Sequence, residues 1–419
     1  MASDSFSDSM RTEKERAPRV VFVVPAYLPE SYGGAEQQTR RFALTLGRLG
    51  ARVTLIAPRL LASTRRRESD LSLEVRRLRV RHAPNLGGRH LPSFFLWGLK
   101  LAAWLWAHRH EYDVIHVIHG RLHAVPAVLA GALLGKPTVV KLGRGGIEHF
   151  DLDLVSRKKL LGKAYVNVLV RRVTAFVANS RQISDDLRRW GIAEPRIVEI
   201  PNGVEVPGYF ESVPDPRGVV RFISVGRLDA EKAIDQMIRG FAGLRERHRA
   251  HLTIVGDGAC RAALEALVEE LGLQSQVTFT GAVSCVTGHL CRADVYLSTS
   301  LSEGMSNALL EAMSYGVMPV ISQVSGASDI IDEGRSGLLF PCGDGDAFSR
   351  QLETAMAISP EARQAMGANA RATMLERFQI DQVARRHLDL YRKLMTCNGE
   401  WPLHASATSS SVGSSVRQS

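Results

Sequence analysis

The sequence predicts an α/β protein in which two doubly wound units follow one another along the chain. A buried apolar strand at Arg19–Pro25 leads through a glycine-containing loop into a helix over Ala35–Leu49. Much later the same plan recurs, with a strand at Val220–Gly226 and a helix that ends near Arg247. Strands that alternate with helices in this way are typical of parallel sheets. Ligands bind at the carboxyl ends of the strands in such sheets, so each unit is expected to offer a ligand-binding edge.

Further short apolar runs between turn residues supply the remaining strands of both units. The first unit continues with candidate strands at Arg52–Ala57, Val114–Ile118, Thr138–Leu142, Ala175–Ala178 and Ile197–Ile200. The second unit continues with candidate strands at Leu252–Val255, Val277–Thr280, Val295–Leu297, Met318–Ile321 and Gly337–Phe340. A proline-rich stretch from 201 to 216 separates the two sets and is interpreted as a linker.

The helical stretch from Glu361 to Met395 has more turns than the second unit needs, so we expect part of it to brace the first unit. Both ends of the chain are polar, and the last residues are rich in serine, which favours disorder. We therefore expect a disordered N-terminus, a first domain, a second domain, a helix that crosses back and a disordered tail, at 1–18, 19–204, 205–375, 376–402 and 403–419.

The composition is that of an ordinary soluble protein, with 45% hydrophobic and 23% charged residues among 419. No uncharged apolar run reaches transmembrane length, and the polar, acidic N-terminus does not resemble a secretory signal. The five cysteines are scattered without metal-ligand spacing, which favours structural or surface thiols in a reducing compartment. We therefore expect a cytoplasmic protein.

The net charge of +10 is unevenly distributed. Arginines crowd the stretch from Arg59 to Arg81, and basic residues alternate with apolar ones from Asp153 to Arg172, as in an amphipathic helix. Basic amphipathic surfaces suit anionic lipid, so a peripheral position on the inner face of the cell membrane is one expectation. A solvated helix face packed on a core is the alternative. No aromatic platform or nucleic-acid motif accompanies the charge, and we expect no nucleic-acid partner.

Two glutamates lie on either side of a predicted helix start. An apolar strand at Ala293–Ser298 precedes Glu303, which therefore lies in a strand-to-helix loop. The helix begins near Ser306 or Asn307, and Glu311 lies two turns into it. The N-terminus of such a helix attracts phosphate. Two carboxylates that flank an anion site suit a ligand with hydroxyls at both ends and a diphosphate between them, as in a sugar nucleotide.

Arg227 and Lys232 directly follow the opening strand of the second unit, at the edge where the ligand crevice is expected. Arginine offers a planar fork and lysine a mobile point charge, which together suit a diphosphate. The alternative is that both are surface cations in a loop. Gly256 follows the next strand and is interpreted as part of a tight turn that lets backbone approach the ligand, with Arg261 as a candidate phosphate contact.

In the first unit, Gly33 and Gly34 open the helix, so that backbone N–H groups can approach a ligand held by the other domain. A turn that needs glycine only for its geometry is the alternative. His116 and His119 end the strand at 114–118 and point to opposite faces if the strand continues. His119 is the better candidate for a polar contact to a sugar, and a histidine satisfied by nearby backbone is the alternative.

Two pairs of aspartates, Asp151 with Asp153 and Asp344 with Asp346, have the spacing of carboxylates that could bind a metal. Neither pair follows a buried strand at a predicted crevice. Surface loops are therefore the expectation for both pairs.

Taken together, these blocks resemble the retaining glycosyltransferases of family 4, which have the GT-B fold of two Rossmann-like domains facing across a cleft. The resemblance covers about Val20 to Tyr391. The specific parts of the resemblance are, in chain order, Gly33-Gly34-Ala35-Glu36, Pro201-Asn202-Gly203-Val204, Val225-Gly226-Arg227-Leu228 with Glu231-Lys232, Val255-Gly256-Asp257-Gly258 and Ser302-Glu303-Gly304 with Leu310-Glu311-Ala312-Met313.

The resemblance implies roles for these residues. Arg227 and Lys232 are expected to bind the donor diphosphate, Glu303 to lie at the transferred sugar and Glu311 to accept hydrogen bonds from the ribose. Backbone groups of the loop formed by Met305, Ser306, Asn307 and Ala308 are expected to touch sugar or phosphate. The family usually has one residue between the two histidines, whereas this chain has Val117 and Ile118, so a local bulge is needed to aim His119. Asp329 also stands where the family commonly has glutamate.

The resemblance implies a metal-independent enzyme without cofactors, which moves a hexosyl unit from a nucleoside diphosphate sugar to a saccharide or lipid-linked acceptor. Biosynthesis of cell-surface polysaccharide or glycolipid is the expected setting. Two alternatives stay open at this point: a sugar-nucleotide epimerase of the same fold, and a non-catalytic subunit that binds the sugar nucleotide.

Overall fold

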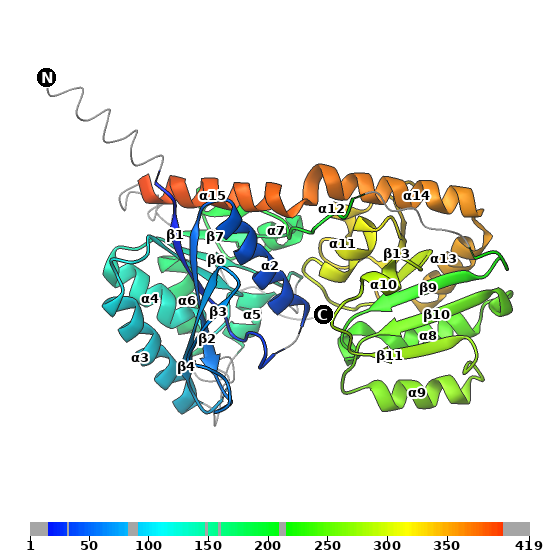
Figure 1. Cartoon of the computed structure of the whole chain (residues 1–419), viewed down its shortest axis with the longest axis horizontal. Coiled ribbons are helices and arrows are strands. Elements are labelled where there is room, and N and C mark those ends of the chain that lie inside the picture. Colours follow the sequence, from blue (N-terminus) through cyan, green and yellow to red (C-terminus); the bar gives the residue numbers. More distant parts are fainter. Residues whose placement is uncertain are drawn as a thin grey trace, which may run out of the picture.

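The computed structural model describes residues 16–31, 33–82, 91–146, 150–157, 161–208 and 215–396. The predicted disorder of the two chain ends therefore concerns residues that lie outside this description, apart from 16–18. Two parallel α/β sheets, each with helices on both faces, stand side by side (Figure 1). This arrangement confirms the two doubly wound units predicted from the alternation of strands and helices.

The first sheet has eight strands in the order β3-β4-β2-β1-β5-β6-β7-β8, all parallel except for β3, which pairs antiparallel with β4. Its strands are β1 Arg19–Val23, β2 Arg52–Arg59, β3 Arg67–Asp70, β4 Leu73–Arg79, β5 Val114–Ile118, β6 Thr138–Lys141, β7 Ala175–Ala178 and β8 Ile197–Glu199. The helices around it are α2 Gly34–Arg48, α3 Leu91–Ala107, α4 Ala124–Leu134, α5 Asp151–Ser156, α6 Gly162–Arg172 and α7 Arg181–Arg189, with a 3-10 turn at Glu194–Arg196.

The second sheet has six parallel strands in the order β11-β10-β9-β12-β13-β14. These strands are β9 Val220–Val225, β10 Ala250–Val255, β11 Val277–Gly281, β12 Val295–Ser298, β13 Met318–Ser322 and β14 Leu338–Phe340. Its helices are α8 Ile234–Ala242, α9 Arg261–Glu270, α10 Thr287–Leu290, α11 Asn307–Ser314, α12 Ala327–Ile330, α13 Gly345–Ala357 and α14 Pro360–Thr373, with 3-10 turns at Ala230–Lys232 and Arg247–Arg249.

The last helix, α15 (Ile380–Thr396), belongs to the packing of the first domain. A π-turn at Met374–Phe378 joins it to α14, and the two helices run almost end to end across the tops of both domains (Figure 1). Leu388 and Tyr391 of α15 are buried in the same apolar cluster as Phe22 of β1. The Tyr391 hydroxyl lies 2.5 Å from Nδ1 of His116 in β5. The helix that was expected to cross back to the first domain is confirmed.

The two basic stretches both lie in the first domain. The arginine-rich residues after Arg59 form the β3–β4 hairpin at the edge of the sheet, where Leu73 and Val75 point inward between charged neighbours. Arg77 is also buried, beside Glu68 at 2.9 Å. The single helix expected from 153 to 172 is instead two helices, α5 and α6, with residues 158–160 outside the description. Gly162 allows the start of α6 to lie close to the end of α5, because a Cβ there would lie 2.5 Å from the Val155 carbonyl oxygen.

Candidate active site

A cavity of about 490 Å³ lies between the two domains, where the carboxyl ends of both sheets face each other. The first domain lines it with the loop before α2 and with the ends of β5 and β6. The second domain contributes the end of β9 and the loop from 303 to 308. Of the residues predicted to form the site, the lining includes Gly33, Gly34, His119, Arg227, Lys232, Glu303, Met305, Ser306, Asn307 and Ala308. Glu311 and Gly256 do not line it.

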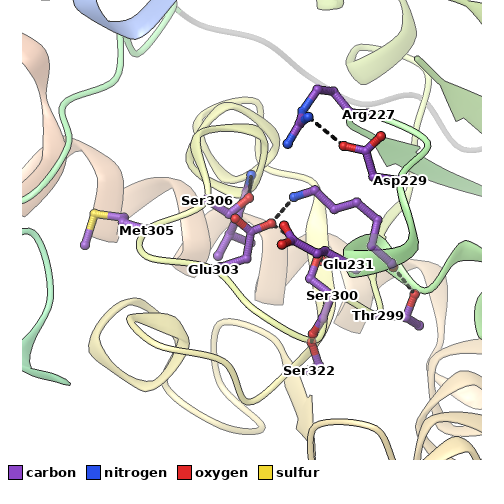
Figure 2. A network of polar contacts seen from close by, with 12 residues as sticks. Arg227, Asp229, Glu231, Thr299, Ser300, Glu303, Met305, Ser306 and Ser322 are labelled. Atoms are coloured by element: carbon purple, nitrogen blue, oxygen red, sulfur yellow. Dashed lines mark hydrogen bonds and ion pairs between the residues drawn. The ribbon is translucent and has the colours of Figure 1, made fainter. Parts of the chain in front are cut away.

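Lys232 and Glu303 form an ion pair on the second-domain side of this cavity. Both side chains are largely buried, and Glu303 also accepts a hydrogen bond from the Ser300 hydroxyl at 3.2 Å. Figure 2 shows Glu303 and Ser300 in the loop that follows β12 and precedes α11. Thr299 fixes the backbone around Lys232 by donating to its carbonyl oxygen at 3.0 Å. A cation and a carboxylate are therefore held together where the second sheet meets the cavity.

Arg227 lies at the more open edge of the same site. Its guanidinium contacts Asp229 at 2.6 Å, and its side chain is 60% exposed (Figure 2). An arginine with this exposure can change rotamer at little cost, because it is not locked by packing. Arg227 and Lys232 thus bring a mobile and a fixed cation to one side of the cavity.

The loop from Met305 to Ala308 is held by the first domain and by the linker. Ser306 caps α11 by accepting from the Leu309 N–H at 3.4 Å. Asn202 donates to the Met305 carbonyl at 3.2 Å and to the Asn307 side-chain oxygen at 2.9 Å. Asn307 in turn donates to the Gly34 carbonyl at 3.0 Å. The segment that was interpreted only as a linker therefore also positions the loop at the start of α11.

The start of α2 contributes Gly33 and Gly34. Gly33 is the N-cap of α2, and a Cβ at this position would lie 2.7 Å from a Glu36 carboxylate oxygen. The other Glu36 oxygen accepts from the Ser31 hydroxyl at 2.7 Å. These contacts leave the backbone at 33–34 open to the cavity.

Glu311 is engaged from across the domain boundary. Its carboxylate forms an ion pair with Arg41 of α2, and both side chains are substantially buried. The ion pair directs the Glu311 carboxylate toward α2. Sequence reasoning missed Arg41, because a helix-surface arginine has no local signal for a partner in another domain.

Gly256 and Arg261 lie away from the cavity lining. Gly256 has φ +142°, and a Cβ on it would overlap the Gly226 carbonyl oxygen, so glycine is needed for the loops after β9 and β10 to lie together. Arg261 contacts Asp257 at 3.0 Å and Glu265 at 2.8 Å. The tight turn is present, but these residues support the loop that carries Arg227 and do not face the cavity.

His119 has φ +69°, an unusual value for a residue with a side chain. This conformation ends β5 and turns the ring toward the cavity, which supplies the reorientation that the two-residue spacing requires. Its Nδ1 has no hydrogen-bond partner among the described residues. Burial lowers the pKa of His119 to about 4, so the ring is neutral near pH 7. His116, in contrast, lies inside the first domain beside Tyr391.

Three cationic side chains that line the cavity were not singled out from the sequence. Lys141 is the last residue of β6, and Arg144 follows three residues later. Arg144 donates to both carboxylate oxygens of Glu231 in the second domain, at 3.0 and 2.9 Å. Arg121 contacts Asp151 at 3.1 Å. Their position after strands β5 and β6 is the signal that could have identified them.

The aspartate pairs have structural roles. Asp151 was expected in a surface loop, but it is fully buried and accepts from the Gly143 N–H at 2.8 Å. Asp153 accepts from the Trp190 ring N–H at 3.0 Å. Asp344 caps α13 through the Ala347 N–H at 2.8 Å. Within the described part of the chain, no group of three or more His, Cys, Asp or Glu side chains could hold a metal ion.

The two halves of the chain match two protein-family models. Residues 33–203 match the model described as a glycosyl transferase 4-like domain. Residues 209–373 match the model described as glycosyl transferases group 1. Together the matches cover both domains and all the cavity-lining residues predicted from the sequence.

The curated relatives have low sequence identity to this chain, and several align with it over only part of their own length. N-acetyl-alpha-D-glucosaminyl L-malate synthase of Bacillus anthracis is 23% identical over 312 residues, which cover 68% of this chain and 76% of the relative. The GDP-mannose-dependent alpha-mannosyltransferase of Mycobacterium tuberculosis is 28% identical over 280 residues, covering 63% and 69%. Other relatives align over less than half their length, such as the lipopolysaccharide core glycosyltransferase LpsD of Rhizobium meliloti at 46%.

Solved structures share the whole fold. Sucrose-phosphate synthase from Thermosynechococcus elongatus superposes with a TM-score of 0.75 at 20% identity, covering 90% of this chain and 99% of that one. Anabaena HepE in complex with UDP-glucose has a TM-score of 0.69 at 18% identity, covering 90% and 99%. At these identities the likeness concerns the fold, and it confirms the expected GT-B arrangement.

Proposed function

We propose that this chain, which belongs to the family 4 glycosyltransferases of the GT-B fold, moves a hexosyl unit from a nucleoside diphosphate sugar with retention and without a metal. The observation that carries the proposal is the cation set at the end of β9, where Lys232 and Arg227 line the same cavity as Glu303. Cations beside a departing diphosphate stabilise charge that develops in the transition state. They can thus take the part that a divalent cation has in other phosphate-leaving reactions.

In the proposed reaction the bond between the anomeric carbon and the diphosphate oxygen breaks while the acceptor oxygen bonds to the same face of the sugar. The departing phosphate receives the acceptor proton, so no covalent nucleophile is needed. Glu303 lies at the transferred sugar and forms an ion pair with Lys232. His119 is neutral and offers a ring nitrogen to a sugar hydroxyl. Closure of the domains excludes water and so limits hydrolysis.

The descriptions of two relatives suggest which donor bases and sugars to test. Anabaena HepE is described in complex with UDP-glucose, and the mycobacterial relative is described as GDP-mannose-dependent. UDP-glucose, UDP-N-acetylglucosamine and GDP-mannose are therefore the donors to test first. Each is incubated with the protein, with and without EDTA, and nucleotide release and the anomeric configuration of the product are measured by NMR.

A retaining transferase releases nucleoside diphosphate from at least one donor, with or without EDTA, and forms an α-linked product from an α-linked donor. Lys232→Ala and Glu303→Gln are expected to lower this rate at least about a hundredfold, since each removes a charge at the reacting groups. Lys163→Ala and Glu269→Gln, which change exposed residues far from the cavity, serve as matched controls. Isomerised donor without transfer, or binding without turnover, contradicts the proposal.

The acceptor is proposed to be saccharide or lipid-linked, with the protein at an anionic membrane surface. None of the helices in the described ranges has both the length and the apolarity to cross a membrane. However, α3 is apolar on two faces: Trp97 and Leu101 are buried, whereas Leu99 is 71% and Trp106 59% exposed. Leu133 of α4, which packs against α3, is 84% exposed.

The sequence around this apolar face is basic, because Glu111 and Asp113 are the only acids between Arg76 and Lys136. Exposed apolar side chains within a basic region suit an anionic lipid surface. Sedimentation with vesicles tests this: binding to vesicles that contain phosphatidylglycerol is expected to exceed binding to pure phosphatidylcholine. Leu99→Glu should abolish the difference, and Leu375→Glu, at an exposed leucine of the second domain, should preserve it. Equal sedimentation of wild type and Leu99→Glu contradicts the membrane proposal.

A further inference from the structure

Lys141 places a positive charge inside the cavity with no acidic partner among the described residues. It ends β6, and its ammonium lies 5.7 Å from the centroid of the Phe42 ring. The neutral rings of His116, His119 and His387 lie within its electrostatic reach, since the charge on this lysine lowers the pKa of each further. Burial lowers the pKa of Lys141 to about 8, so it is still mostly charged at pH 7.

The other charged groups in the described lining of the cavity are already engaged. On the first-domain side, Arg121 contacts Asp151 at 3.1 Å and Arg144 contacts Glu231 at 2.9 Å. On the second-domain side, Arg227 pairs with Asp229 and Lys232 pairs with Glu303. Glu36 is the remaining acid, and it accepts from Ser31. Lys141 is thus the cation of the lining whose charge the described side chains leave uncompensated.

A partly buried charge without an acidic partner is unfavourable, and a ligand that supplies the opposite charge offsets that cost. Lys141 belongs to the first domain, whereas the cations proposed for the donor diphosphate belong to the second. The face of Phe42 beside the ammonium adds an apolar surface against which a ligand carbon skeleton can pack.

We infer that Lys141 binds an anionic group, phosphate or carboxylate, of the acceptor whose hydroxyl receives the sugar. This inference rests on the proposed transferase function and deepens it by assigning a chemical class to the acceptor. The ligand is a hydroxylated compound that carries its negative charge within reach of the first domain. Lys141 selects it through charge and takes no part in the bond-breaking step.

The test compares acceptors in pairs in which one member carries an anionic group and the other is its uncharged counterpart. The probes are glucose 6-phosphate with glucose, L-malate with its dimethyl ester, and glycerol 3-phosphate with glycerol. Vesicles of phosphatidylinositol, compared with phosphatidylcholine, test a lipid headgroup as the source of the same phosphate chemistry. Wild-type protein is expected to use, or be competitively inhibited by, the charged member of at least one pair at least about tenfold more effectively.

Lys141→Met keeps the length of the side chain and removes its charge, and Lys163→Met is the matched control on the exposed surface of α6. The Lys141→Met variant should lose the tenfold preference for the charged member, while the KM of the neutral member and the rate of donor hydrolysis stay within about twofold. Lys141→Arg should retain part of the preference. Glu148→Gln, a change seven residues after Lys141 in the sequence, should leave the preference intact.

Several results overturn the inference. Equal use of charged and neutral acceptors by the wild type does so, and so does loss of the preference in Glu148→Gln. If Lys141→Met weakens nucleotide binding as much as binding of the charged acceptor, the lysine belongs to the donor site. If no donor turns over at all, the proposed function fails, and calorimetric titration of glucose 6-phosphate in the presence of UDP then decides the inference separately. Binding that is equal in wild type and Lys141→Met refutes it.

Discussion

Arg41 of the first domain and Glu311 of the second form an ion pair across the domain boundary. If Glu311 accepts hydrogen bonds from the ribose, a bound nucleotide must share this carboxylate with Arg41 or displace it. Arg41→Ala is therefore expected to tighten nucleotide binding about twofold to fivefold, the scale of a partly exposed ion pair. Isothermal titration with UDP and GDP measures this.

Arg48→Ala is the matched control, because Arg48 lies on the same helix and pairs with Asp381 at 3.3 Å on the surface. It should leave nucleotide affinity unchanged. When Glu311 is already replaced by alanine, adding Arg41→Ala should leave the nucleotide affinity unchanged. Weaker nucleotide binding by Arg41→Ala would show that the pair helps to hold the nucleotide.

Gly304 is a second point where the domains touch. A Cβ on Gly304 would overlap the Gly143 carbonyl oxygen of the first domain. Gly304→Ala should therefore keep the domains apart and lower the rate of transfer at least about tenfold, while hydrolysis of the donor becomes a larger share of turnover. Gly288→Ala, at an exposed glycine whose Cβ would meet nothing within 4 Å, should leave both rates unchanged. An unchanged ratio of transfer to hydrolysis in Gly304→Ala would count against closure at this contact.

Buried neutral histidines should make the free energy of unfolding depend on pH. Burial lowers the pKa of His387 from 6.5 to about 3, so the unfolded chain takes up a proton that the folded chain refuses. The contribution of His387 to stability is therefore complete above about pH 6.5 and is lost as pH falls from there toward 3, by an amount on the order of 5 kcal/mol. Urea unfolding between about pH 7 and about pH 5 measures the slope. His387→Gln should reduce it, and His248→Gln, at an exposed position, should not; equal slopes would contradict the expectation.

The charge on Lys141 gives a second pH dependence, in catalysis. Because burial lowers the pKa of Lys141 to about 8, the ammonium is lost as pH rises through that value. Arg121 and Arg144, which also line the cavity, stay charged throughout, and His119 stays neutral. The KM of an anionic acceptor should therefore rise about tenfold above pH 8 while the KM of the neutral acceptor stays level. A profile that is unchanged in Lys141→Arg would assign the dependence to another group.

Tyr391 tests the attachment of α15. Tyr391→Phe leaves His116 without a described partner for either ring nitrogen, because its Nε2 already has none. Loss of one buried hydrogen bond should lower the free energy of unfolding by about 1–3 kcal/mol. Chemical denaturation measures this, with Arg392→Lys on the exposed side of α15 as the control. Equal stability of the two variants would show that the contact contributes little.

The positions of the central strands of each sheet could be predicted because buried parallel strands are short apolar runs, such as Val114–Ile118, that need no information from elsewhere. The β3–β4 hairpin could not, since Leu73 and Val75 point inward from a run otherwise full of arginine. Glu303 and Lys232 could be placed at one edge, because both follow strands of the same sheet.

Contacts between the two domains could not be predicted from local sequence patterns. The partner of Glu311 is on α2, and that of Arg144 is on the loop after β9. Neither pairing follows from sequence spacing, because it depends on how two separately folded sheets dock. Lys141 was overlooked for a related reason. It is notable because no acidic side chain among the described residues contacts it, and this is known only once both domains are placed around the cavity.

The packing of α15 has a consequence for how the chain is made. The first sheet is complete in sequence at β8, yet its apolar cluster includes Leu388 and Tyr391, which are synthesised only after the second domain. During synthesis the N-terminal half must wait, with the surface around Phe22 and His116 uncovered, until the second domain has been translated. Fragments that stop before Ile380 carry this defect permanently. Complete folding of the first domain therefore depends on synthesis of the second domain and α15. An early stop codon before α15 damages the half of the protein that was made first.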